Sequence, residues 1–178
     1  ITYLDLPLLC RQLDALGKND QQALLYWNYY ALACRETAEL RLSDTATGEA
    51  LIRLLKNLDT CPPYFDTSYF DTIALVREKE VSFLSAFALA AYCWRIHKRS
   101  ACLGYAWSWL ENQTAAATKL LPLGQTHAQR LIDQLLPQIP NAVESAMAVP
   151  SDAIGASLPA LAMVSSWHET QYSRLFRS

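Results

Sequence analysis

Three histidines and five cysteines are the side chains of this sequence best suited to hold a transition metal. His97, His127 and His168 lie far apart, and none has a second histidine three or four residues away. Cys93 and His97 are spaced i, i+4, so on a helix they would share a face and could offer two ligands. Two ligands do not make a selective site, and a buried thiol beside a surface imidazole is the simpler explanation. We therefore predict no stably bound metal.

The sequence also gives little indication of a phosphate-binding site or of a nucleophilic catalytic residue. The five glycines are scattered, so neither a P-loop nor a GxGxxG turn can form. No GxSxG elbow is present, and Ser108 in the WSWLE segment is expected to be a hydroxyl on a helix surface. A Ser-His-Asp set assembled by the fold is not excluded by composition. We predict a protein that is not an enzyme, with a small helical metal-dependent hydrolase as the alternative.

Composition indicates one domain with an unusually apolar surface. Among the 178 residues, 52% are hydrophobic and only 18% are charged, below the usual quarter. This imbalance is typical of a subunit that works in a complex. The net charge is −2, from 15 basic and 17 acidic residues. No basic run or nucleic-acid-binding motif accompanies it, so nucleic-acid binding is not expected.

The cysteines and the most apolar segment suggest a reducing, non-membrane location. The five cysteines show no short repeated spacing, so we expect free thiols buried as small hydrophobic side chains, and a cytoplasmic protein. The segment 81–96 is mostly apolar but falls short of the ~20 residues that span a bilayer. It contains Arg95 and is followed by further basic residues. A buried central helix is predicted there, without a membrane partner.

The 3.6-residue period dominates the chain and predicts an all-α fold, a single-domain irregular helical bundle over residues 1–178. In segment 48–58, Leu51, Leu54, Leu55 and Leu58 form one apolar stripe. In segment 101–118, Leu103, Trp107 and Leu110 are expected to face inward. A loop is predicted at 59–71 because it contains Pro62-Pro63 and no stripe. The other expected helices are residues 20–34 after an Asn19-Asp20 cap, 72–97, 125–136 after a Pro122 and Gly124 break, and a last helix capped at Ser157.

Three internal segments are better suited to contacts with other proteins than to catalysis. In SWLENQ (108–113), Trp109 and the preceding Trp107 are two residues apart, so on a helix they point in different directions. One can pack inside while the other, with Glu111, faces a partner. Two tryptophans that both lie in the core fit the sequence equally well. In KLLPLGQ (119–125), Lys119 ends a helix, where the helix dipole alone would favour a cation, and Gln125 follows an exposed turn.

The third segment, ACRETAELR (33–41), places Arg35 and Glu39 at i, i+4. A salt-bridged, solvated helix face is the default interpretation of such a pair, with Glu36 on the opposite side. We expect this segment to contribute surface rather than core.

The final segment, HETQYSRLFRS (168–178), is the strongest candidate for a docking site. Tyr172, Leu175 and Phe176 alternate with Arg174 and Arg177, without a Gly or Pro to interrupt them. Aromatic and Arg side chains carry most of the energy at protein interfaces. A last helix packed on its own core is the alternative. The predicted partner-binding residues are Glu111, Lys119, Gln125, Tyr172, Arg174, Phe176 and Arg177.

These four segments, in their order along the chain, resemble the UreF family of urease accessory proteins. The likeness extends from the LDLPLL segment (4–9) to Ser178. Family members begin with an extra segment rich in Leu, Pro, Gly and Ser, whereas this chain opens at Ile1. We therefore expect an N-terminally truncated member of the family.

The resemblance implies an all-helical, typically dimeric protein that performs no catalysis itself. Such a protein would bind the UreD/UreH accessory protein and recruit the GTPase UreG. The assembly would then dock on the urease apoprotein to help couple GTP-dependent events to nickel insertion. The resemblance further implies that the turn at 119–125 influences how the GTPase engages, and that Arg174 supports partner recruitment. Nickel would be handled by the partners, so no cofactor is expected. A purely structural oligomer without a regulatory role is a third possibility.

Overall fold

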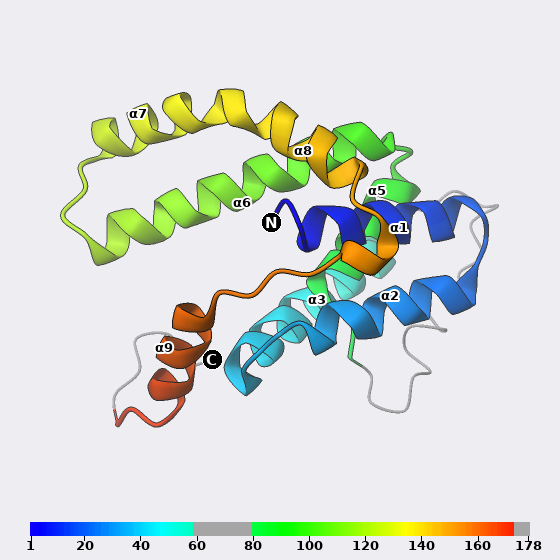
Figure 1. Cartoon of the computed structure of the whole chain (residues 1–178), viewed down its shortest axis with the longest axis horizontal. Coiled ribbons are helices and arrows are strands. Elements are labelled where there is room, and N and C mark those ends of the chain that lie inside the picture. Colours follow the sequence, from blue (N-terminus) through cyan, green and yellow to red (C-terminus); the bar gives the residue numbers. More distant parts are fainter. Residues whose placement is uncertain (59–79, 173–178) are drawn as a thin grey trace.

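The computed structural model describes residues 1–58 and 80–172, and every regular element in these ranges is helical (Figure 1). The all-α, single-domain fold is therefore confirmed. The predicted loop at 59–71 lies outside the described residues. The elements are α1 (Asp5–Gly17), α2 (Gln21–Ala33), α3 (Ala38–Leu58), α5 (Phe83–Cys93), α6 (Lys98–Leu120), α7 (Gln125–Leu135), η1 (Leu136–Gln138), α8 (Ile139–Met147), η2 (Ser151–Ala153) and α9 (Pro159–Glu169).

Helix α5 lies in the hydrophobic core, as the apolar segment 81–96 predicts. Leu84 and Leu89 are fully buried, and the helix packs against α1, α2, α3 and α6. Its bounds differ from the expected helix 72–97. Ser82 caps the start by accepting the backbone N–H of Ser85 at 3.1 Å, and the helix ends at Cys93. Arg95, with φ of 55°, cannot continue it. Among the described residues no helix has the length and apolar character to cross a membrane.

A buried polar network ties α1, α2 and α5 together. Gln12 donates its side-chain N–H to Ser85 Oγ at 2.9 Å, and Ser85 Oγ donates to Asn28 Oδ1 at 2.9 Å. The same Asn28 oxygen accepts the backbone N–H of Ser82 at 2.9 Å. All four residues are fully buried. Because a shift of any helix would break these buried bonds, the network favours one register of the three helices, although Gln12 Oε1 finds no partner in the described part of the chain.

The turn between α1 and α2 follows the sequence prediction. Helix α1 ends at Gly17, and Asp20 Oδ1 accepts the N–H of Ala23 at 2.9 Å, so it caps α2. The left-handed residue of the turn is Asn19, with φ of 57°. Asparagine tolerates this conformation better than most residues.

Helix α3 corrects the prediction for segment 48–58. It begins ten residues earlier, at Ala38, and its buried line consists of Thr45, Gly48, Ile52 and Leu55. Leu54 and Leu58 of the predicted stripe are 49% and 47% exposed. The reason is the contact with α5: a Cβ on Gly48 would lie 2.2 Å from the carbonyl oxygen of Val81. Because only glycine allows this approach, Gly48, and not the leucine stripe, sets the rotation of the helix.

Helices α6 and α7 form an antiparallel pair, broken at Pro122 and Gly124 as predicted (Figure 1). Leu110 is buried, but Trp107 and Trp109 are 45% and 42% exposed, so the expectation of an inward Trp107 was wrong. The short α8 follows η1 and packs on α1 and α6. The predicted cap of the last helix was also wrong by one residue. Leu158 precedes α9, and the hydroxyl of Ser157 instead hydrogen-bonds Glu36 at 2.5 Å.

Candidate protein interaction surface

Helix α9 has its apolar side chains on the outside. An extended segment leads from α8 to α9, which lies against α3 at the edge of the molecule (Figure 1). Leu161, Met163, Val164 and Trp167 are 49% to 62% exposed, and Leu158 just before the helix is 66% exposed. The buried residue of the helix is Ser165. This is the reverse of the usual amphipathic helix, which buries its apolar stripe.

Polar contacts attach α9 to the start of α3. The hydroxyls of Thr37 and Ser165 are hydrogen-bonded at 2.8 Å. His168 Nδ1 lies 2.7 Å from Glu39 Oε1, and the backbone N–H of Glu39 donates to Glu169 Oε1 at 2.9 Å. These bonds orient the helix while the apolar side chains stay uncovered. A contiguous exposed apolar patch of this kind marks an interaction site in soluble proteins.

The second exposed region is the end of the α6–α7 pair. Lys119 lies in the last turn of α6 and is exposed, and Leu120 and Leu121 beside it are 63% and 60% exposed. A cavity of about 420 Å³ lies between the two helices. Glu111 from α6 and Gln125 from α7 both line it, with Thr114, Thr118, Leu123, Gln129 and Ile132 among the neighbouring residues. The groove can therefore offer amide, hydroxyl and carboxylate groups beside apolar surface.

Four of the seven predicted site residues, Glu111, Lys119, Gln125 and Tyr172, lie in the described part of the chain. The structure brings Glu111 and Gln125 to one groove and places Lys119 on the exposed end of the same helix pair. Tyr172 follows α9 and is fully exposed. Arg174, Phe176 and Arg177 lie outside the described residues. The sequence analysis did not include the apolar residues of α9 among the candidate binding residues. The signal that could have pointed to them is that the expected last helix has no charged residue before His168.

The Arg35 segment is not the solvated surface that its spacing predicts. Helix α2 ends before Arg35, whose guanidinium is mostly buried and lies 3.2 Å from Asp5 Oδ1 and 3.3 Å from Asp44 Oδ1. Glu39, its expected partner, pairs with His168 instead. The i, i+4 pattern failed because the chain turns between α2 and α3.

The carboxyl group of Asp44 is held in an unfavourable place for a charge. Burial raises the pKa of Asp44 above its ordinary value, while Arg35 acts in the opposite direction. Its Oδ2 atom is buried and finds no hydrogen-bond partner in the described part of the chain. Burial also acts to lower the pKa of Arg35, but Asp5 and Asp44 outweigh it and the pKa is raised. Arg35 is thus a permanent cation that joins α1 to α3.

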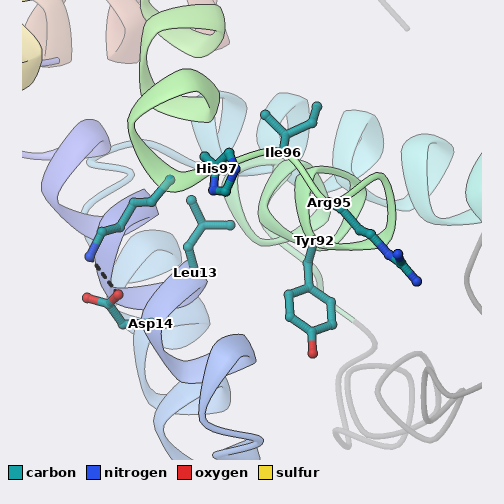
Figure 2. A pocket seen from close by; sticks show the side chains of 7 residues that line it. Leu13, Asp14, Tyr92, Arg95, Ile96 and His97 are labelled. Atoms are coloured by element: carbon teal, nitrogen blue, oxygen red, sulfur yellow. Dashed lines mark hydrogen bonds and ion pairs between the residues drawn. The ribbon is translucent and has the colours of Figure 1, made fainter.

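A second cavity, of about 400 Å³, adjoins α1 and the link between α5 and α6. Figure 2 shows Leu13, Tyr92 and His97 around it, with the side chain of Arg95 directed away from Asp14. Cys93 is disulfide-bonded, so the expectation of a free thiol at this position was wrong. Its sulfur atom is therefore not available as a metal ligand beside His97. Across residues 1–58 and 80–172, no three His, Cys, Asp or Glu side chains are grouped so as to hold a metal.

The fold and these surfaces define an all-helical protein with large exposed apolar areas at its edges. Comparison with known proteins identifies its family. A model of the UreF family matches residues 1–136. A urease accessory protein UreF from Marinomonas sp. (strain MWYL1) is 49% identical over 178 residues, which is all of this chain and 73% of that relative. Proteins of the same name from Psychrobacter cryohalolentis and Chromohalobacter salexigens are 45% and 43% identical over the same coverage. The chain belongs to the UreF family.

Proposed function

We propose that this chain is a urease accessory protein that acts by binding other proteins and not by catalysis. Its relatives are named urease accessory proteins, and they are similar to this chain over its whole length. The observation that supports a binding role is α9, whose polar side is held against α3 while its apolar side is exposed. Because these side chains are already about half covered, covering the rest of each should contribute roughly 1 kcal/mol, about half of the value for full burial.

In this proposal the protein is a scaffold. It links a UreD/UreH accessory protein and the GTPase UreG to the urease apoprotein, and it helps to couple GTP-dependent events to nickel insertion. It works as a homodimer in the cytoplasm, and nickel is carried by its partners.

The decisive experiment is co-expression with UreD/UreH, UreG and apo-urease, followed by sizing of the complexes. Deleting residues 172–178 should abolish GTPase recruitment while the circular dichroism spectrum stays helical. Leu161→Ser on α9 should weaken co-purification of a partner, because a polar side chain removes apolar contact area. Leu54→Ser on α3 is the matched control, since both leucines are 49% exposed.

A complex that survives both the tail deletion and Leu161→Ser would show that this end of the molecule is not the docking site. Turnover of a substrate by the purified chain, or nickel retained stoichiometrically after dialysis, would instead favour the metal-dependent hydrolase. Unchanged partner binding on deletion of the tail is what the purely structural oligomer predicts.

A further inference from the structure

Two buried cysteines from distant parts of the chain are in contact. Cys10 on α1 and Cys102 on α6 have their sulfur atoms 3.5 Å apart, and the two residues are 1% and 0% exposed. Both are free thiols. A disulfide has an S–S distance of about 2.05 Å, so a movement of roughly 1.5 Å would join them. Packing alone does not require two sulfur atoms to face one another here.

An ion pair lies one helical turn away from this contact on both helices. Asp14 follows Cys10 by four residues on α1, and Lys98 precedes Cys102 by four residues on α6. Lys98 Nζ lies 2.7 Å from Asp14 Oδ1, and this bond is the dashed line at Asp14 in Figure 2. Both residues also line the 400 Å³ cavity. The cysteine pair therefore lies one helical turn from two residues that line this cavity.

The surroundings make the two thiols unequal. The hydrogen bond from Cys102 lowers the pKa of Cys10, and Lys98 adds to this effect against the opposing influence of burial. The same hydrogen bond and burial raise the pKa of Cys102. Cys10 is thus the more readily ionised thiol of the pair, which is the asymmetry needed for stepwise oxidation.

We propose that Cys10 and Cys102 form an oxidisable dithiol, which a small hydroperoxide converts into a disulfide that joins α1 to α6. The Cys10 thiolate attacks the peroxide, so an S–O bond forms and the O–O bond breaks, and the leaving oxygen takes up a proton as water or alcohol. Cys102 then attacks the Cys10 sulfenic acid: the S–S bond forms, the S–O bond breaks, and hydroxide leaves with the Cys102 proton as water. Two thiols lose two electrons and one peroxide gains them.

Burial determines which oxidant and which cysteines take part. Sulfur atoms with almost no exposed surface cannot meet a bulky disulfide such as oxidised glutathione, whereas hydrogen peroxide has only two heavy atoms. Cys34 is half-buried, and burial raises its pKa, so its thiolate is scarce. Because α6 also carries Glu111 and Lys119, the new bond would tie the proposed binding region to α1.

The full chain, fully reduced at its free thiols, is treated with hydrogen peroxide and quenched. It is then unfolded in an alkylating reagent and mapped by non-reducing peptide mass spectrometry. We expect a peptide pair linking Cys10 to Cys102 to form while Cys34 remains alkylatable. Cys34→Ser is the matched control and should leave the cross-link intact. Oxidation of Cys34 with Cys10 and Cys102 still alkylated would overturn the proposal.

Single substitutions test the order of the two steps. In Cys102→Ser the cross-link is lost, and a dimedone probe should label Cys10 as sulfenic acid. In Cys10→Ser, dimedone should label little at Cys102. The opposite labelling pattern would contradict the assignment of Cys10 as the attacking thiolate. The wild-type map decides whether the disulfide forms even if a serine variant does not fold.

Discussion

At the scale of single residues, the position of Asp44 gives a pH-dependent contribution to stability. Because its pKa is raised in the folded protein by burial, folding with a charged carboxylate costs free energy. The protonated form carries no such cost. Stability from this group is therefore highest below the unfolded pKa of about 3.9 and decreases as the pH rises through the raised folded value.

We expect Asp44→Asn to raise the free energy of unfolding at pH 7, because the amide carries no charge that folding must desolvate. The difference from the wild type should vanish near pH 3–4. Urea denaturation at a series of pH values measures both effects. A loss of more than about 2 kcal/mol at pH 7 would show that the ion pair with Arg35 outweighs the cost of burial.

Lys119 can be tested for function apart from stability because it is exposed. Lys119→Ala should change the free energy of unfolding by less than about 0.5 kcal/mol, as surface substitutions usually do. It should nevertheless lower urease activation in a co-expression assay. Lys18→Ala is the control, since Lys18 is also exposed at the C-terminal end of a helix. If a fall in melting temperature accounts for the whole defect, Lys119 is structural.

At the scale of elements, the contact between α3 and α5 depends on a glycine. Gly48→Ala should lower the free energy of unfolding by at least about 1–3 kcal/mol, because the added methyl group meets backbone atoms that cannot move aside. Gly104→Ala is the matched control on α6, where nothing lies within 4 Å of the new Cβ. There alanine should stabilise by about 0.5–1 kcal/mol. Equal effects in chemical denaturation would refute this role for Gly48.

The elements also show what the sequence could and could not predict. Asp20, Pro122 and Gly124 act through their immediate neighbours, so the turns they define were predictable. The rotation of α3 was not, because it is set by the distant backbone at Val81. Arg35 was misplaced for the same reason: Asp5, one of its partners, is thirty residues away. Local pattern predicts local structure, and long-range contacts override it.

The assignment of the candidate site residues to partner binding stays a prediction, and the structure gives only the positions of those that it describes. Lys119 and Gln125 stood out because a helix ends between them, and Glu111 because it follows Trp109. Glu111 and Gln125 line one cavity between α6 and α7, and Lys119 lies in the last turn of α6. The exposed face of α9 could not be derived from sequence. An apolar helix is ordinarily buried. Helix α9 is different because its polar side chains make the contacts with the start of α3, so its apolar side chains face outward. Its role in binding stays a prediction.

At the scale of the whole molecule, α9 should be dispensable for folding. A chain ending at Gly155 keeps Ile154, whose carbonyl accepts the Tyr30 hydroxyl at 2.7 Å. Among the described residues it loses the Ser157–Glu36 bond and the polar contacts of α9 with the start of α3. Its free energy of unfolding should fall by roughly 1–3 kcal/mol, because a few partly exposed polar contacts are lost and no large apolar side chain leaves the core. A chain ending at Ala148 also loses Val149 and Ile154, both buried, and should lose several kcal/mol. Similar losses from the two truncations would place α9 in the cooperative core.

The apolar face of α9 also determines the heat-capacity change and the salt dependence expected when a partner binds there. A partner that covers Leu161, Met163, Val164 and Trp167 removes apolar surface from water without breaking an ion pair. Calorimetry should then record a negative heat-capacity change on association. Added sodium chloride should change the affinity little, because screening acts on charges and not on hydrocarbon.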